Sequence, residues 1–282
     1  MNRFSQRHGF EPVKDTIQLN DMDDALRTGL WNALTIVFWP EAPNYNRVKS
    51  HNQLYALFAE LWVDYFKKPL DTLPYEWSRA LKEVREYFFK YPWYCVYNFV
   101  EFAAENYPNE SQTKMFVSYC NDILKRELSG YRFIGKKIVP ITSEEEITEI
   151  EEALKPTETL RPVAIHLETA LDFLSDRESP DYRNSIKESI SAVESTCRLI
   201  AGDDKAKLNQ ALRVIKDKIG LHRALEKAFD SLYGYTSDED GIRHALLDEP
   251  DLDFEDARFM LVSCAAFINY LKSKSSKAGI KL

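Results

Sequence analysis

The stretch DMDDALRTGLWNALTIVF, residues 21–38, carries the pattern that decides the fold. Its apolar residues recur mostly at spacings of three and four: Leu26, Leu30, Leu34, Val37 and Phe38. This spacing puts the side chains on one face of an α-helix, where they form a stripe that can be buried. Asn20 or Asp21 is placed to cap the helix, acids in the first turn favour its positive end, and Pro40 ends it. The stretch therefore predicts an amphipathic helix.

The same periodicity continues along most of the chain, and only nine glycines interrupt it. Prolines mark the ends of several segments in the first half, because proline cannot continue a helix. We expect further helices at residues 47–67, 75–90, 92–106, 110–129, 142–154, 161–176, 180–201, 204–219, 221–232 and 253–274. The predicted fold class is therefore mostly α.

One segment changes period. Residues 131–141 place β-branched and aromatic residues on both sides of a Gly-Lys-Lys turn, which predicts a short β-hairpin. The Thr-Ser-Glu-Glu-Glu stretch that begins at Thr142 then predicts a capped helix. Prolines 156 and 162 break the chain, so we place a boundary near residues 155–160. We thus expect two helical domains, 1–155 ending in the hairpin region and 156–282.

Composition limits the class of protein. At 282 residues, with 44% hydrophobic and 13% aromatic content, the chain can bury one large or two compact cores. Its hydrophobic runs are too short to span a bilayer, and its first residues lack the apolar run of a signal peptide, so we expect a cytoplasmic protein. The four cysteines lie far apart in apolar helical patterns and predict buried reduced thiols: Cys95, Cys120, Cys197 and Cys264. No metal or cofactor motif is present, and neither group is expected.

The net charge of −8 is shared evenly between the two predicted domains, and neither has the basic balance of a general nucleic-acid binder. A local exception lies on the helix expected after Lys205, whose buried stripe is Leu208, Leu212, Ile215 and Ile219. Basic residues outside that stripe are candidates for contacts with RNA phosphates: Lys205, Lys207, Arg213, Lys216 and Lys218. The alternative interpretation is a solvated helix face with packed lysine stems.

Residues 233–245 form an acidic turn that places Arg243 and His244 side by side before the last expected helix. A guanidinium can hold a phosphate and an imidazole can move protons near neutral pH, so the pair can support phosphodiester chemistry without a metal. In the structural alternative, Arg243 binds acids of its own turn and His244 caps or packs. The isolated histidines are interpreted as structural or surface residues: His51, His166 and His222.

Three stretches of the first half resemble the AbiJ-type N-terminal domain of bacterial abortive-infection proteins. They are RFSQRHGF at residues 3–10, LRTGLWN at 26–32 and GYRFIGKKIVPI at 130–141. The resemblance covers about residues 1–155. It implies that the chain takes part in antiphage defence.

The second half is similar to a divergent HEPN-type helical domain of the same defence proteins. The similarity rests on SIKESISAVE at residues 185–194, GIRHA at 241–245 and ARFMLVSCAAFINYL at 257–271. It implies a helical bundle, often dimeric. In active members it also implies a metal-independent ribonuclease that leaves cyclic-phosphate ends.

The Arg-His spacing departs from that family. Active members carry four to six residues from Arg to His, whereas Arg243 and His244 are adjacent. The wider spacing occurs at Arg161 and His166, on a helix at the other end of the expected bundle. Two side chains on one turn can still converge on a phosphate, particularly across a dimer.

Two main classes of function remain open, and a nucleotide-transfer or nucleotide-binding role is a third option to which the sequence contributes nothing specific. The first is an antiphage ribonuclease that cleaves RNA through Arg243 and His244, dimerises through its HEPN-like domain and answers a phage or host protein trigger. The second is a catalytically inactive scaffold or a sensor that binds a phage component or a partner protein. We interpret the aromatic residues between 45 and 100 as core, and an exposed patch among them would favour the second class. A basic ridge that faces the cleft of His244 would favour the first.

Overall fold

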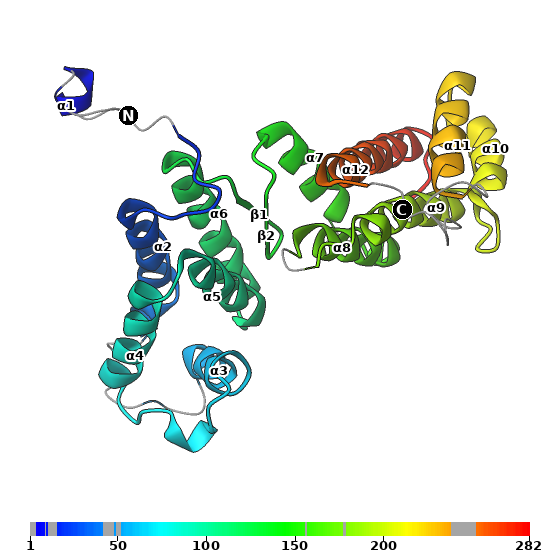
Figure 1. The fold of residues 1–282 in the computed structure, drawn as a ribbon. Coiled ribbons are helices and arrows are strands. Elements are labelled where there is room, and N and C mark those ends of the chain that lie inside the picture. Colours follow the sequence, from blue (N-terminus) through cyan, green and yellow to red (C-terminus); the bar gives the residue numbers. More distant parts are fainter. Residues whose placement is uncertain are drawn as a thin grey trace. The chain divides into compact units, whose positions relative to one another are not determined.

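The computed structural model describes residues 4–8, 10, 16–41, 48, 52–155, 157–176, 179–237 and 252–282. The described chain is mostly helical with one short two-stranded sheet (Figure 1), which confirms the predicted fold class. Two compact units divide it, an N-terminal unit of Met1–Ile141 and a C-terminal unit of Thr142–Leu282. None of the helices in the described ranges is both long and apolar enough to cross a membrane.

The N-terminal unit is a group of helices followed by a hairpin. Its helices are α1 (Phe4–Arg7), α2 (Asp24–Val37), α3 (Gln53–Glu60), α4 (Trp77–Lys90), α5 (Trp93–Asn106) and α6 (Glu110–Arg126). Helix α3 continues into a π-helical segment, η2 (Leu61–Tyr65), and short 3-10 turns lie at η1 (Trp39–Glu41) and η3 (Leu70–Thr72). Within the segment expected as one helix over 47–67, the described α-helix begins at Gln53, with Asn52 as its cap, and changes type at Leu61. Residues 47 and 49–51 lie outside the described residues.

Helix α2 buries the predicted stripe, and all five of its apolar residues belong to the core. Its cap is Asp23, rather than Asn20 or Asp21. The Asp23 carboxylate accepts the Leu26 backbone N–H at 2.8 Å, and the Asp23 N–H donates to Gln18 Oε1 at 2.6 Å. Because this second bond holds the backbone in a turn, the helix begins later than the acidic run alone indicates.

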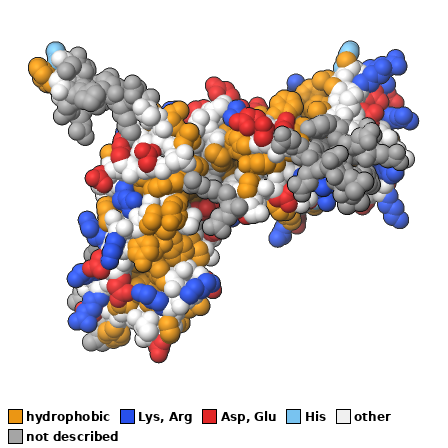
Figure 2. Space-filling view, in the orientation of Figure 1, with side chains coloured by type: hydrophobic (Ala, Val, Ile, Leu, Met, Phe, Trp, Pro, Cys, Tyr) orange, Lys and Arg blue, Asp and Glu red, His pale blue; other side chains and the backbone are white. Residues whose placement is uncertain are grey.

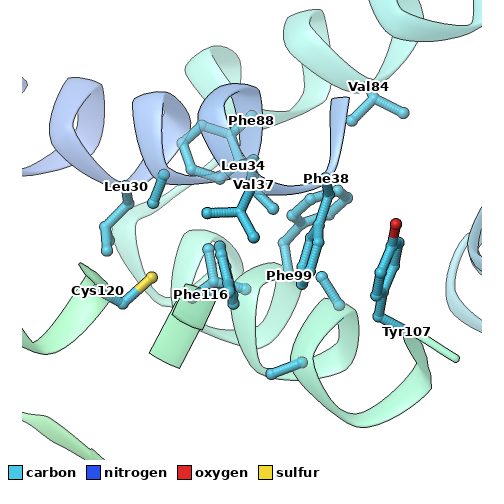
Figure 3. Packing of buried hydrophobic residues seen from close by; sticks show 14 of the residues in the cluster. Leu30, Leu34, Val37, Phe38, Val84, Phe88, Phe99, Tyr107, Phe116 and Cys120 are labelled. Carbon is cyan, nitrogen blue, oxygen red and sulfur yellow. The ribbon is translucent and has the colours of Figure 1, made fainter. Parts of the chain in front are cut away.

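Aromatic rings fill the core between α2, α4, α5 and α6 (Figure 3). The Phe38 ring stacks on Tyr107 with centroids 4.0 Å apart, and it contacts Phe116 at 4.5 Å. Phe88 and Phe99 meet edge to face at 5.7 Å. Most of the aromatic residues between 45 and 100 are buried or half-buried in this cluster, in agreement with their interpretation as core.

The predicted hairpin is present. Strand β1 (Arg132–Ile134) pairs antiparallel with β2 (Lys137–Val139), and Ile134 lies opposite Lys137. Gly135 in the turn has φ +60°, a conformation that glycine adopts without a Cβ penalty. The Asn121 side chain of α6 binds both the N–H and the C=O of Phe133, at 2.8 and 2.9 Å, which ties the hairpin to the helices.

The C-terminal unit is a helical assembly around α9. Its helices are α7 (Glu144–Leu154), α8 (Arg161–Ser175), α9 (Tyr182–Ala201), α10 (Leu208–Ile219), α11 (Arg223–Ser237) and α12 (Phe254–Lys277). Helices α8, α10 and α12 pack on α9, and α7 packs on α12. Ser143 caps α7, as the sequence predicts. The four cysteines are free thiols; Cys120, Cys197 and Cys264 are buried, and Cys95 is half-buried.

Helix α7 belongs to the C-terminal unit by its contacts. The Asn269 amide of α12 donates to the Glu149 backbone carbonyl and carboxylate, both at 2.9 Å, and Arg258 pairs with Glu146 at 3.1 Å. The compact units therefore divide between Ile141 and Thr142, one helix before the boundary expected near 155–160.

Candidate nucleic-acid interface

The predicted basic helix is α10, and its apolar stripe is buried as expected. The helix begins at Leu208, so Lys205 and Lys207 precede it instead of lying on its flanks. The Lys205 N–H donates to the Asp203 carboxylate at 3.0 Å, and the Lys207 N–H donates to Gln210 Oε1 at 3.1 Å. Because these backbone N–H groups bond side chains in a turn and a helix cap, the first helical turn begins after them. Both lysine side chains are exposed.

Lys218 has a structural contact. Its ammonium donates to the backbone carbonyls of Ile200 and Ala201, at 3.3 and 2.6 Å. The last carbonyls of a helix have no partner within the helix and carry partial negative charge, so a cation there stabilises α9. Of the five predicted RNA contacts, Lys218 is therefore engaged at the end of a neighbouring helix.

Arg213 and Lys216 lie together in a groove between α10 and α11. The groove has a volume of about 380 Å³, and its charged lining is Arg213, Lys216, Arg223, Glu226, Lys227 and Asp230. Four cations thus face two carboxylates. Figure 2 shows Lys and Arg side chains along this end of the C-terminal unit, with acidic ones between them.

Only part of the groove's positive charge is paired. Lys216 lies 3.4 Å from the Glu226 carboxylate. Arg213, Arg223 and Lys227 are exposed, and they form no ion pair with any described residue. A groove with unpaired guanidinium groups fits phosphate oxygens, because the planar fork matches their geometry. The predicted RNA contacts include Arg213 and Lys216 but neither Arg223 nor Lys227, which belong to the next helix.

Arg243 and His244 lie outside the described residues. The elements on either side are described: α11 ends at Ser237, and α12 begins at Phe254. The Asp253 carboxylate accepts the Asp256 N–H at 3.0 Å and the Asp256 carboxylate accepts the Asp253 N–H at 3.2 Å, which forms a capping box.

A second imidazole of the C-terminal unit has a carboxylate partner. His166 Nδ1 on α8 lies 2.6 Å from Glu188 Oε2 on α9, and both side chains are half-buried. A carboxylate at Nδ1 fixes the orientation of the ring and leaves Nε2 for another group. His166 looks isolated in the sequence, because the two residues are far apart in the chain and no spacing signal joins them.

The described residues contain no cluster of His, Cys, Asp and Glu that could hold a metal ion. The groove offers cations and hydrogen-bond donors. Its arrangement suits the binding of a phosphate backbone, and its described lining contains no hydroxyl, thiol or imidazole side chain.

The fold and the groove define a helical protein of two units with a basic surface on the second. Residues 2–156 match the family model described as AbiJ N-terminal domain 4, and this range is more than half of the chain. The chain belongs to the AbiJ N-terminal domain 4 family, which confirms the predicted AbiJ-type domain and associates the protein with abortive infection. Neither a curated protein nor a solved structure matches the chain.

Proposed function

We propose that the protein is a cytoplasmic antiphage defence protein whose C-terminal unit is HEPN-like, dimerises, and cleaves RNA through Arg243 and His244. A phage or host protein would act as its trigger. The observation that carries the proposal is the basic groove between α10 and α11. Helix α11 leads along the chain into the segment that holds the Arg-His pair, so the same part of the sequence supplies phosphate-binding and proton-transfer groups.

The chemistry needs only these side chains. His244 removes the proton from a ribose 2′-hydroxyl, the 2′-oxygen attacks the adjacent phosphorus, and the bond from phosphorus to the 5′-oxygen breaks. The leaving oxygen takes a proton from an imidazolium, which a second subunit's pair can supply in a symmetric dimer. Arg243 stabilises the charge that develops on the phosphoryl oxygens. The products are a 2′,3′-cyclic phosphate and a 5′-hydroxyl.

The test compares growth and total-RNA integrity in cells that express the wild type, His244→Ala or Arg243→Ala at equal levels. We expect the wild type to arrest growth and cleave RNA, and both variants to lose most of this effect, because removing a general base typically costs about 10²–10⁴-fold in rate. His166→Ala is the matched control, since it removes the carboxylate-paired imidazole of α8.

The control also separates two locations for the chemistry. Loss of cleavage in His166→Ala with full cleavage in His244→Ala contradicts the proposed pair and moves the activity to α8 and α9. If wild type and variants behave alike, and the purified proteins leave RNA intact with phage lysate added, the ribonuclease proposal fails.

A second candidate is a non-enzymatic sensor or scaffold. An aromatic cavity in the N-terminal unit favours it, since its lining includes Tyr91, which is 47% exposed. In that case the Arg243→Ala and His244→Ala variants would still protect cells from phage, whereas a ribonuclease would lose protection with either change.

A further inference from the structure

The N-terminal unit contains a cavity of about 610 Å³ where α4 and α5 meet η2. Five aromatic residues contribute to its lining: Trp62, Tyr65, Phe66, Tyr87 and Tyr91. The volume lies within the range that proteins use for small-molecule ligands, and rings with a few polar groups are the usual lining of such sites. The cavity is therefore large enough for one nucleotide-sized molecule.

The backbone at this cavity departs from regular helix. In η2 the Phe66 N–H donates to the Leu61 carbonyl at 2.8 Å, one residue further back than in an α-helix. Lys67 follows with φ +52°, a left-handed conformation that residues with a Cβ seldom adopt. Insertions of this kind are frequent at functional sites, because they change the direction of neighbouring side chains.

The rings form a prearranged stacking surface. Tyr87 lies between Tyr91, with centroids 4.3 Å apart at 30°, and Phe66, at 5.0 Å and 76°. The Tyr65 hydroxyl bonds the Tyr87 hydroxyl at 3.0 Å, and Arg27 of α2 donates to the Tyr91 carbonyl at 2.8 Å. Tyr91 is thus fixed at its backbone and packed on one side, while the residue as a whole is 47% exposed.

The position for a cation inside the cavity is already filled. The Lys68 ammonium lies 5.2 Å from the centre of the Trp62 ring and 3.0 Å from the Glu83 carboxylate. Glu86 also faces a lysine, since Lys82 lies 3.9 Å from its carboxylate. An external cation would find both carboxylates of the lining engaged.

The lining side chains that are not engaged in these pairs supply one cation and hydrogen-bond donors. Lys90 and Asn98 line the cavity, and neither side chain has a polar partner among the described residues. The buried Trp62 indole N–H likewise has no acceptor among the described residues. A cation and an amide without polar partners among the described residues, on the wall of one cavity, fit a ligand that offers acceptors and negative charge.

We propose that this cavity binds a nucleotide. The base stacks on Tyr91, the Asn98 amide bonds the edge of the base, and the phosphate pairs with Lys90. The same chemistry is present in a free nucleotide and in one nucleotide of a single strand. The proposal concerns the N-terminal unit and stands whether or not the C-terminal unit cleaves RNA.

The test is calorimetric titration of the full chain with AMP, CMP, GMP and UMP and, separately, with short single-stranded oligodeoxynucleotides. DNA lacks the 2′-hydroxyl that the proposed cleavage requires, so binding is measured without that reaction. Saturation by a mononucleotide, with no gain for the oligonucleotide, supports a free nucleotide as ligand. Saturation by the oligonucleotide alone supports a nucleotide within a single strand.

Two variants and two controls locate the binding. We expect Tyr91→Ala to weaken Kd about tenfold or more through lost stacking, and Lys90→Glu to weaken it and reduce its salt dependence. Tyr94→Ala removes a ring of similar exposure, 49%, and Lys114→Glu makes the same charge change on α6; both leave Kd unchanged within about twofold. The proposal is overturned if wild type binds neither class of probe, or if Tyr94→Ala weakens binding as much as Tyr91→Ala.

Discussion

The two units build their buried cores from different kinds of side chain. The N-terminal core is aromatic, and its largest fully buried residues include Phe38, Phe58, Trp62, Phe99 and Phe116. In the described C-terminal unit Phe267 is the one buried aromatic residue, and the core around α9 consists of aliphatic, small and hydroxyl side chains. Large rings hold helices apart and can enclose a cavity, whereas small residues let helices approach closely.

Hydroxyl groups mark the contact between α8 and α9. The buried Ser185 hydroxyl of α9 donates to the Ala170 carbonyl of α8 at 2.8 Å, and Ser189 donates to the Ser185 carbonyl at 2.9 Å. Both of these hydroxyls are therefore satisfied by a backbone carbonyl. Cavity-forming rings and close helix contacts are thus separated between the two units, so each unit has its own sensitivity to substitution.

The largest effect is expected from Phe38→Ala. Phe38 is fully buried between Tyr107 and Phe116, so its removal leaves a cavity among rings and should lower the free energy of unfolding by about 3–5 kcal/mol. All five tryptophans lie between residues 31 and 93, so their fluorescence reports the N-terminal unit during denaturant unfolding. Tyr94→Ala is the exposed control. An unchanged fluorescence midpoint for Phe38→Ala would show that this core is less tightly packed than described.

Ser185→Leu should act on the other unit. It adds volume at a site with no exposed surface and removes the bond to Ala170, so we expect a loss of about 1–3 kcal/mol. Circular dichroism should detect the loss, while the tryptophan transition stays at its wild-type position. Ser191→Leu, at a half-buried position of the same helix, is the control and should change stability by less. A shift of the tryptophan transition would mean that the units unfold together.

Alkaline pH should weaken the aromatic unit through Tyr97. Burial raises the pKa of Tyr97 from 10 to about 12, against an opposing hydrogen bond with Ser129 at 2.8 Å. The folded chain therefore keeps this proton longer than the unfolded chain, and stability is lost as the pH rises from 10 towards 12. At about pH 11 the expected loss is about 1.4 kcal/mol.

Tyr97→Phe tests the source of this loss. The variant has no ionisable group at this position, so its decrease in unfolding free energy between about pH 8 and pH 11 should be smaller than that of wild type. Tryptophan fluorescence is again the readout, because Tyr97 lies in the N-terminal unit. Equal decreases in both proteins would assign the alkaline loss to other residues.

The smallest effect is expected at the end of α9. Gly202 has φ +73°, its N–H donates to the Arg198 carbonyl at 2.8 Å, and an added Cβ would meet no atom within 4 Å. Gly202→Ala should therefore lower stability by about 1 kcal/mol through backbone strain alone. Gly202→Asn should lose less, since Asn tolerates the left-handed region. Equal losses would point to a role of the glycine other than its conformation.

Much of the fold could be predicted from local patterns. The helix α2 stripe, the hairpin at residues 131–141 and the capped start of α7 all follow from spacing and turn chemistry within a few residues. The start of α10 was misplaced, because the loop side chains of Asp203 and Gln210 turn and cap the backbone there. The π-helical turn of η2 could not be predicted, because the spacing of apolar residues does not change there.

The candidate site was predicted only in part. Arg213 and Lys216 were singled out from charge on one helix, but the groove also needs Arg223 and Lys227 from α11. His166 and Glu188 come together across α8 and α9, and no spacing rule brings them together. Arg243 and His244 remain a prediction from the sequence.

The fold class, the position of the hairpin, the AbiJ-type domain and the presence of the Arg-His pair follow from the sequence alone, because periodicity, turn residues and family motifs are local properties of the chain. The tertiary structure was needed to show that Lys218 is engaged at the end of α9, and that Arg213 and Lys90 form no ion pair with any residue that the structure describes. It alone assembled the aromatic cavity from α4, α5 and η2. The physical reason is that pairing and cavity shape depend on side chains that meet across helices, and their distances are set by how the whole core packs.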